Sequence, residues 1–228
     1  MPQTWFTRLW LGGLVCTCLA ATAIGATVPI LSGSDLTGVT EWNGTLSVKN
    51  SDVAISTYGE PVWKAPTLGG QWISYTLSGP GQNPVVNVPL DGSGFILGGP
   101  SARFFYQFTL PSAAVSGQVS IWADDTAAVL LDGAVMLALT PNPVRAIWCT
   151  EGAAGCQPAN AGVVDLSGLS AGTHTISIEA YQLWGNTFGV LYEGAVVIAD
   201  VPEPSTVLLL ASGLLMLAWR RACAVARG

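Results

Sequence analysis

The sequence predicts an all-β protein: a two-sheet, jelly-roll-like sandwich flanked by an N-terminal signal peptide and a C-terminal transmembrane helix. Between residues 27 and 200, apolar and polar residues alternate with a period of two, which places successive side chains on opposite faces of a strand. Clusters of Gly, Pro, Asp and Ser divide this region into many short segments. Short strands at such spacing favour a sandwich, and the two uncharged, mainly apolar runs lie outside this region, near the chain ends.

The N-terminal segment, residues 1–26, has the layout of a cleavable secretory signal. Arg8 precedes an uncharged, mainly apolar run over 9–21, and small residues follow directly. We expect the mature chain to begin between Ile24 and Thr27, after transfer through the secretion machinery.

The expected ectodomain, residues 27–200, is one domain built from strands. A loop at 31–35 is expected before the first strand, and no helical stretch interrupts the series. Asp132 and Gly133 lie between two apolar segments and predict a hairpin turn, because Gly adopts positive φ readily. The expected strands span residues 45–48, 53–56, 71–76, 85–88, 103–109, 118–123, 127–131, 134–139, 145–148, 173–182, 187–192 and 195–199.

The charge and the cysteines restrict partners and redox environment. The formal net charge of the chain is −6, which argues against nucleic acid as a partner. Of the five cysteines, Cys149 and Cys156 fall in the part expected to reach an oxidising compartment. A two-cysteine metal site is the alternative, but no further His or Cys lies near them in the sequence. We predict that Cys149 and Cys156 form a disulfide.

A proline-rich segment over 201–206 follows the last expected strand. Pro202 and Pro204 prevent that strand from continuing, because proline fixes φ and lacks an N–H donor. Ser205 can cap a helix that begins here, with Glu203 close to the positive end of its dipole. The segment therefore predicts the start of a C-terminal helix.

That helix is expected over residues 207–219, a run without charge. At about 1.5 Å per residue it would extend roughly 20 Å, which is short for a hydrocarbon core of about 30 Å. Trp219 suits a membrane interface, and Arg220 and Arg221 would stop the helix and hold the tail in the cytoplasm.

The order of a proline-flanked glutamate, a short apolar helix and a basic end resembles the PEP-CTERM sorting signal of exported proteins in Gram-negative bacteria that make extracellular polysaccharide. The resemblance covers residues 201–228: a motif over 201–206, a transmembrane helix over 207–219 and a basic cytoplasmic tail over 220–228. It implies that exosortase, an integral membrane processing enzyme, recognises the tail and cuts it near the motif. The sorting motif would comprise Val201, Pro202, Glu203, Pro204 and Ser205. The alternative is an ordinary tail anchor with a proline-rich start.

A second resemblance lies inside the ectodomain. Residues 120–133, with a tryptophan and acids before a hairpin, and residues 166–178, with the pattern L-x-x-G-x-H-x-I, look like core strands of galactose-binding-like jelly rolls. The resemblance covers residues 103–181. It implies a fold more than a ligand, since one fold supports many functions.

The candidate ligand site consists of Trp122, Asp124, Asp125 and Asp132. Carboxylates grouped in this way suit Ca²⁺, the one candidate cofactor, or sugar hydroxyls beside a tryptophan. The alternative is a turn in which the Asp side chains accept hydrogen bonds from local backbone N–H groups. Alternation places Val119, Ile121 and Ala123 on one strand face, so Trp122 and Asp124 should lie together on the other.

Signals for catalysis are weak. Residues 168–172 match G-x-S-x-G formally, and His174, the one histidine of the chain, is close by. The nucleophile elbow requires a strand before the serine and a helix after it, whereas residues 173–182 alternate as a strand. We therefore expect a turn, and a structural histidine on the apolar strand face.

These observations favour a non-catalytic protein of the cell envelope or extracellular matrix. It would be exported across the inner membrane, anchored at first by its C-terminal helix, and sorted through its Pro-Glu-Pro motif. A structural or adhesive role linked to exopolysaccharide or biofilm is the first interpretation. The alternative is a carbohydrate- or calcium-binding module.

Overall fold

The computed structural model describes residues 25–33, 37–41, 47–49, 63–75, 87–139, 154–185, 187–199, 211–216 and 218. Nearly all regular structure in these ranges is β. The strands are β1 (Thr27–Leu31), β2 (Thr37–Glu41), β3 (Ser47–Lys49), β4 (Ala102–Leu110), β5 (Ala114–Asp124), β6 (Thr126–Leu131), β7 (Ala134–Leu137), β8 (Gly162–Asp165), β9 (Gly172–Tyr181) and β10 (Gly189–Ile198). A 3₁₀ turn, η1, spans Pro158–Asn160, and residues 211–216 and 218 are helical.

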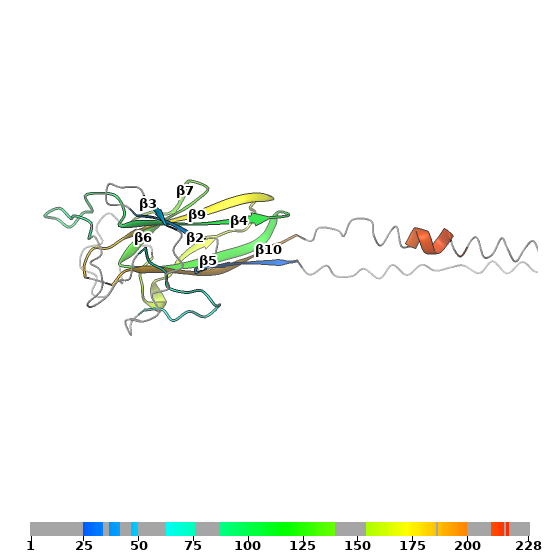
Figure 1. The fold of residues 1–228 in the computed structure, drawn as a ribbon, viewed down its shortest axis with the longest axis horizontal. Coiled ribbons are helices and arrows are strands. Elements are labelled where there is room, and N and C mark those ends of the chain that lie inside the picture. Colours follow the sequence, from blue (N-terminus) through cyan, green and yellow to red (C-terminus); the bar gives the residue numbers. More distant parts are fainter. Residues whose placement is uncertain are drawn as a thin grey trace, which may run out of the picture.

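The strands form two antiparallel sheets packed face to face (Figure 1). One sheet has the order β1-β10-β5-β8 and the other has the order β3-β2-β4-β9-β6-β7. From β4 to β10 the chain changes sheet at every step except the β6–β7 hairpin. Crossing between sheets in this way places strands on both sides of one core, and it confirms the predicted all-β sandwich.

The core lies between the sheets and follows the predicted alternation. Val119, Ile121 and Ala123 of β5 are fully buried in it, as are Ile176 and Ile178 of β9. Aromatic side chains fill its centre at ring-centroid distances between 5.4 and 6.2 Å, typical of edge and offset contacts. They belong to Tyr75, Phe104, Tyr106, Phe108, Phe188 and Tyr192.

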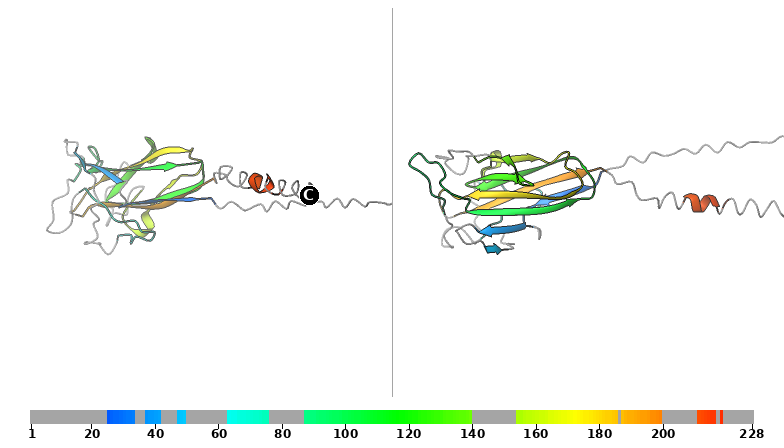
Figure 2. Two further views of the ribbon diagram at one scale, coloured as in Figure 1. Left: turned by 45° about the vertical axis from the view of Figure 1, so that its right-hand side comes forward. Right: turned by 90° about the horizontal axis from the view of Figure 1, so that it is seen from above.

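The chain enters and leaves the sandwich at the same end. Thr27, the first residue of β1, pairs with Val197, close to the last residue of β10. The views in Figures 1 and 2 agree that both ends of the described sandwich chain lie there. We call this the tail-proximal end. At the opposite, distal end, Gly189 of β10 pairs with Asp124 of β5.

Several elements differ from the sequence prediction. Strand β2 was not predicted, and residues 87–88, the described part of the predicted strand 85–88, do not lie in a strand. Strand β1 forms where a loop or unassigned chain was expected, and it contains Pro29, a residue that strands tolerate at a sheet edge. Strand β8, four residues long, was not predicted either. Residues 71–76 were predicted as a strand, but their described part forms a single bridge, from Ile73 to Val190.

The predicted strands 187–192 and 195–199 are one continuous strand, β10. Gly194 between them suggested a break. A Cβ at Gly194 would lie 2.2 Å from the carbonyl oxygen of Gln118 on the adjacent strand. The glycine therefore permits close strand contact rather than a turn. The predicted strands 53–56 and 145–148 lie outside the described residues.

Candidate functional site

The base of the C-terminal tail is fixed to the sandwich. The last strand ends at Ile198, whose N–H donates to the carbonyl of Ala26 at 2.9 Å. The N–H of Ala199 donates to the carbonyl of Ala113 at 2.9 Å, and the Ser112 hydroxyl donates to the carbonyl of Ala199. The chain is thus ordered by hydrogen bonds up to the residue before Asp200.

The predicted sorting motif, Val201 to Ser205, and the predicted membrane stop, Arg220 and Arg221, lie outside the described residues. Of the predicted helix over 207–219, residues 211–216 and 218 are described, and they are helical and exposed. In the described ranges, no helix has both the length and the apolar character that a membrane span requires.

Trp122 is buried, with 6% of its surface exposed. It points away from the main core, as predicted, but packs in a second cluster with Trp63, Trp72 and Leu191. Its Nε1 has no hydrogen-bond partner in the part of the chain that is described. A ligand site on this face would need Trp122 at the surface, but a chain segment distant in sequence covers this face of β5.

The covering segment is held by Glu193, a residue that the sequence did not single out. Glu193 is buried, with 3% of its surface exposed. Its carboxylate accepts hydrogen bonds from the N–H groups of Thr67, Leu68 and Gly70 at 2.8 to 3.0 Å, and from the Thr67 hydroxyl. Burial acts to raise the pKa of Glu193, but these hydrogen bonds outweigh it and hold the pKa below its usual value. No pattern around Glu193 indicates this role, because the N–H groups that converge on its carboxylate lie more than 120 residues away in the sequence.

Cys156 lies fully buried in the same cluster as Trp122 and is disulfide-bonded. Its predicted partner, Cys149, lies outside the described residues, so the pairing stays a prediction. The carbonyl of Cys156 also accepts from the N–H of Lys64, and the Lys64 ammonium lies 5.3 Å from the Trp122 ring centroid. The cluster thus joins β5, β10, the 63–72 segment and the residues around Cys156.

Asp125 stabilises a loop at the distal end. Its carboxylate accepts from the N–H groups of Leu183 at 2.7 Å and Trp184 at 2.9 Å. Burial raises the pKa of Asp125, against the effect of these hydrogen bonds and of one with Asp124. Asp124 itself is 7% exposed. Both acids are therefore part of the corner between β5 and β6.

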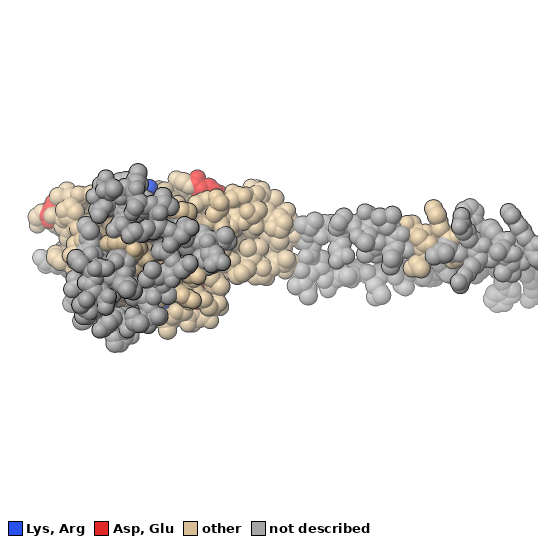
Figure 3. Space-filling model, in the orientation of Figure 1, with Lys and Arg blue, Asp and Glu red and all other residues tan. Residues whose placement is uncertain are grey.

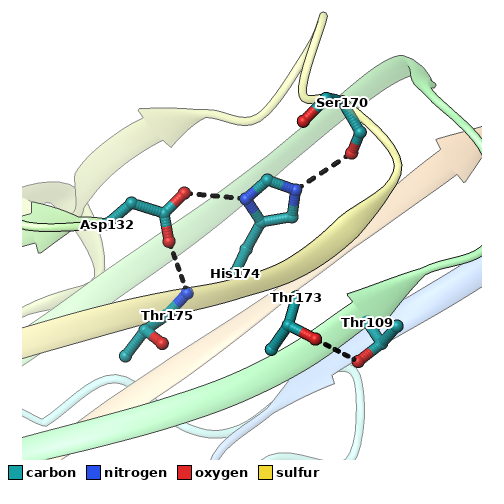
Figure 4. A network of polar contacts seen from close by, with 6 residues as sticks. All are labelled: Thr109, Asp132, Ser170, Thr173, His174 and Thr175. Atoms are coloured by element: carbon teal, nitrogen blue, oxygen red, sulfur yellow. Dashed lines mark hydrogen bonds and ion pairs between the residues drawn. The ribbon is translucent and has the colours of Figure 1, made fainter.

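Asp132 lies at the other end of β6 and binds His174 (Figure 4). One oxygen of its carboxylate is 2.7 Å from Nδ1 of His174, and the other accepts from the N–H of Thr175 at 2.7 Å. Nε2 of His174 lies 3.0 Å from the carbonyl of Ser170, so both ring nitrogens face acceptors. The hydrogen bond to Asp132 raises the pKa of His174, and both ring nitrogens have a structural partner.

The structure does not bring the three predicted calcium ligands together. Asp125 and Asp132 flank the six-residue strand β6. Because a strand rises about 3.3 Å per residue, the two acids lie roughly 20 Å apart. In the described ranges, no group of three or more His, Cys, Asp or Glu side chains is arranged to hold a metal ion. The predicted turn at Asp132 and Gly133 is present, with φ of 51° and 82°.

The predicted turn before His174 is also present. Residues 166–171 form a turn with positive φ at Gly168, and β9 begins directly after it at Gly172, whose φ is also positive. The formal G-x-S-x-G match is therefore not a nucleophile elbow, as predicted from the alternation of 173–182.

Comparison with known proteins identifies the C-terminal segment. Residues 200–222 match the PEP-CTERM protein-sorting motif. The chain carries a PEP-CTERM sorting signal. The match covers the predicted Pro-Glu-Pro motif, the apolar run and both stop arginines. It indicates an exported protein whose sorting depends on exosortase, a membrane processing enzyme.

No curated protein has a significantly similar sequence. Among solved structures, the alpha-L-rhamnosidase of Streptomyces avermitilis, complexed with L-rhamnose, is 20% identical over 61% of this chain and 12% of its own, with a TM-score of 0.37. The cycloisomaltooligosaccharide glucanotransferase of a Paenibacillus sp. is 19% identical over 54% of this chain and 16% of its own, with a TM-score of 0.26. The GH26-CBM35 beta-(1,4)-mannanase of Podospora anserina is 16% identical over 57% of this chain and 27% of its own, with a TM-score of 0.25. The chain thus spans a small part of each, and these similarities are too low to indicate a ligand or an activity.

The PEP-CTERM signal follows the sandwich without a separate linker domain. It begins at residue 200, directly after Ala199, the last residue tied to the body. The first strand, β1, begins at the tail-proximal end of the sandwich, and the last described residue before the sorting signal, Ala199, lies at the same end.

Proposed function

We propose that this protein is a non-catalytic component of the cell envelope or extracellular matrix, and that an exosortase-type enzyme removes its tail after export. The observation that carries this proposal is the PEP-CTERM signal at 200–222, which begins directly after the last sandwich strand. In its removal one peptide bond breaks, its acyl side passes to water or another nucleophile, and the tail leaves with a new amino terminus.

The arrangement of the two ends supports this proposal. Seven residues, 200–206, separate Ala199 from the apolar run, and fully extended chain covers at most about 3.6 Å per residue, or roughly 25 Å. The tail-proximal end would therefore lie close to the membrane while the tail is in place. The distal end would point away from it, into the periplasm or the matrix.

The acids of the described sandwich support a structural role. Asp125, Asp132 and Glu193 each accept hydrogen bonds from the backbone of another segment, and Glu179 pairs with Arg103 across β4 and β9. A two-carboxylate hydrolase would instead need facing acids in a cleft. On the face drawn in Figure 3, the described surface carries few charged side chains, which suits a neutral polymer better than nucleic acid.

A substitution in the motif tests the proposal. Glu203→Ala, or replacement of both Pro202 and Pro204 by Ala, should leave export and folding intact but block tail removal. Cell fractionation with intact-mass measurement, in a host that has the processing enzyme, should then find the full-length variants in the inner membrane. Asp200→Ala is the matched control, since it removes a neighbouring acid and keeps Pro-Glu-Pro. Normal maturation of both the Glu203 and the proline variants would contradict the proposal.

Carbohydrate binding is the second candidate function, favoured by Trp184 at the distal end. This side chain is 59% exposed, while its backbone is held by Asp125 and by the Gln182 side-chain amide. Gln182 is fully buried, and its Oε1 has no hydrogen-bond partner within the described ranges. A fixed, exposed indole suits stacking on a sugar ring, a contact worth on the order of 1 kcal/mol.

Co-sedimentation with the polysaccharide of the producing cells tests this second function. The wild-type ectodomain should sediment with the polymer, and Trp184→Ala should reduce the bound fraction severalfold. Trp63→Phe, in the buried cluster, is the control for general loss of structure. Equal sedimentation of wild type and Trp184→Ala would contradict a role for Trp184.

A further inference from the structure

The residues at the base of the tail are held from two sides, by elements that come from distant parts of the sequence. On one side the N-terminal residues before β1 pair with the end of β10: the carbonyl of Ala26 accepts from Ile198 N–H. A Cβ at Gly25 would lie 2.4 Å from the carbonyl oxygen of Ile198, so only glycine fits at this distance. Residues 25–26, at the expected signal-peptide boundary, are therefore packed against the end of β10.

On the other side, the turn between β4 and β5 holds Ala199. The carbonyl of Ala113 accepts from its N–H, and the hydroxyl of Ser112 donates to its carbonyl. Both polar backbone groups of Ala199 thus have partners in this turn. We call residues 112–113, which lie well inside the expected mature chain, the collar.

The collar is itself fixed to the sandwich. Ala114, the next residue, donates its N–H to the carbonyl of Leu169 at 2.8 Å and accepts from the N–H of Gly168 at 3.1 Å. These bonds join the 112–113 turn to the turn that precedes β9, where His174 binds Ser170 and Asp132 (Figure 4). The collar is therefore a rigid part of the tail-proximal end rather than a loose connection.

We propose that the collar positions the sorting motif for tail removal, with Ser112 as a positioning residue. This inference rests on the proposed exosortase-dependent sorting. The collar fixes the chain at Ala199, seven residues before the expected apolar helix, so the processing enzyme has less of the connecting chain to hold in place. Each additional unordered residue costs conformational entropy, which slows a reaction that needs one fixed geometry.

The proposal predicts slower tail removal when the collar is loosened. Ser112→Ala deletes one of the two bonds to Ala199, and it should lower the rate of tail removal about threefold. Insertion of Gly-Ser between Ala199 and Asp200 leaves the collar intact but adds two flexible residues between the collar and the motif, and it should lower the rate about tenfold or more. The measurement is a pulse-chase of the full-length protein in the host, with intact mass defining the tail-less product.

Two variants separate positioning from general stability. Ser112→Thr keeps the hydroxyl and should restore the wild-type rate. Thr109→Ala is the control at the same end of the sandwich: it removes an exposed contact between the hydroxyls of Thr109 and Thr173, 3.1 Å apart, and leaves both bonds to Ala199 in place. Its tail should be removed at the wild-type rate. The melting temperatures of the purified Ser112→Ala and Thr109→Ala ectodomains should agree within about 2 °C.

The outcomes distinguish this inference from the proposed function. Wild-type processing with unchanged or faster processing of both Ser112→Ala and the insertion variant would overturn the collar proposal and leave sorting intact. Equal slowing in Ser112→Ala and Thr109→Ala would also overturn it, because the effect would then follow from stability. Failure of the wild-type protein to lose its tail would refute the sorting proposal itself.

Discussion

Glu193→Gln tests whether one buried carboxylate holds the 63–72 segment over the sandwich. In the wild type, four donor groups of Thr67, Leu68 and Gly70 converge on the carboxylate. The amide retains one acceptor oxygen and places an NH₂ group against the remaining donors. A hydrogen bond to a buried charged group contributes about 1.5–3 kcal/mol, so we expect a loss of about 3 kcal/mol in the free energy of unfolding.

For a domain of this size about 1 kcal/mol changes the melting temperature by about 2–4 °C, so the expected decrease is about 6–12 °C. Thermal unfolding followed by near-ultraviolet circular dichroism measures it. Acrylamide should also quench tryptophan fluorescence more strongly, because the segment covers Trp122. Glu179→Gln is the control: its partner Arg103 is partly exposed, so the cost should be below about 1 kcal/mol. Equal melting of the Glu193 and Glu179 variants would refute the reasoning.

Three further predictions concern the other titratable and ligand groups. The His174–Asp132 pair should contribute its full stability, about 1 kcal/mol after solvent screening, between about pH 4 and 6.5. This contribution should disappear as pH rises through the raised pKa of His174 and as pH falls through the lowered pKa of Asp132. His174→Gln should remove the loss of stability above about pH 6.5 in urea unfolding. Thiol labelling of the unreduced exported protein should modify neither Cys149 nor Cys156, and labelling of both without denaturant would disprove the disulfide. Melting temperatures in Ca²⁺ and in chelator should agree, since Asp125 and Asp132 lie at opposite ends of β6; an increase of several degrees with Ca²⁺ would contradict that view.

The alternation of apolar residues predicted the local structure well. It placed Val119 and Ile121 in the core and Trp122 on the outer face of β5, as the structure has them. Such patterns report which strand face a side chain occupies. They do not report whether a loop covers that face, so the burial of Trp122 could not be predicted from them.

Long-range contacts explain the other differences. Asp124, Asp125 and Asp132 are close in sequence, yet a full strand separates Asp125 from Asp132, so the predicted three-acid site does not form. Glu193 gave no local signal because its partners lie more than 120 residues away. Similarly, β1 is stabilised by pairing with β10 across nearly the whole chain, which no local pattern around Pro29 reveals.

Intact-mass measurement of the protein from the cell surface or matrix tests the central claim most directly. The account predicts a mature form that begins between Ile24 and Thr27 and lacks the helix over 207–219 with the arginines that follow it. A surface-located form that retains Arg220 to Gly228 would contradict exosortase-dependent sorting, and residues 207–219 would then be a short membrane anchor.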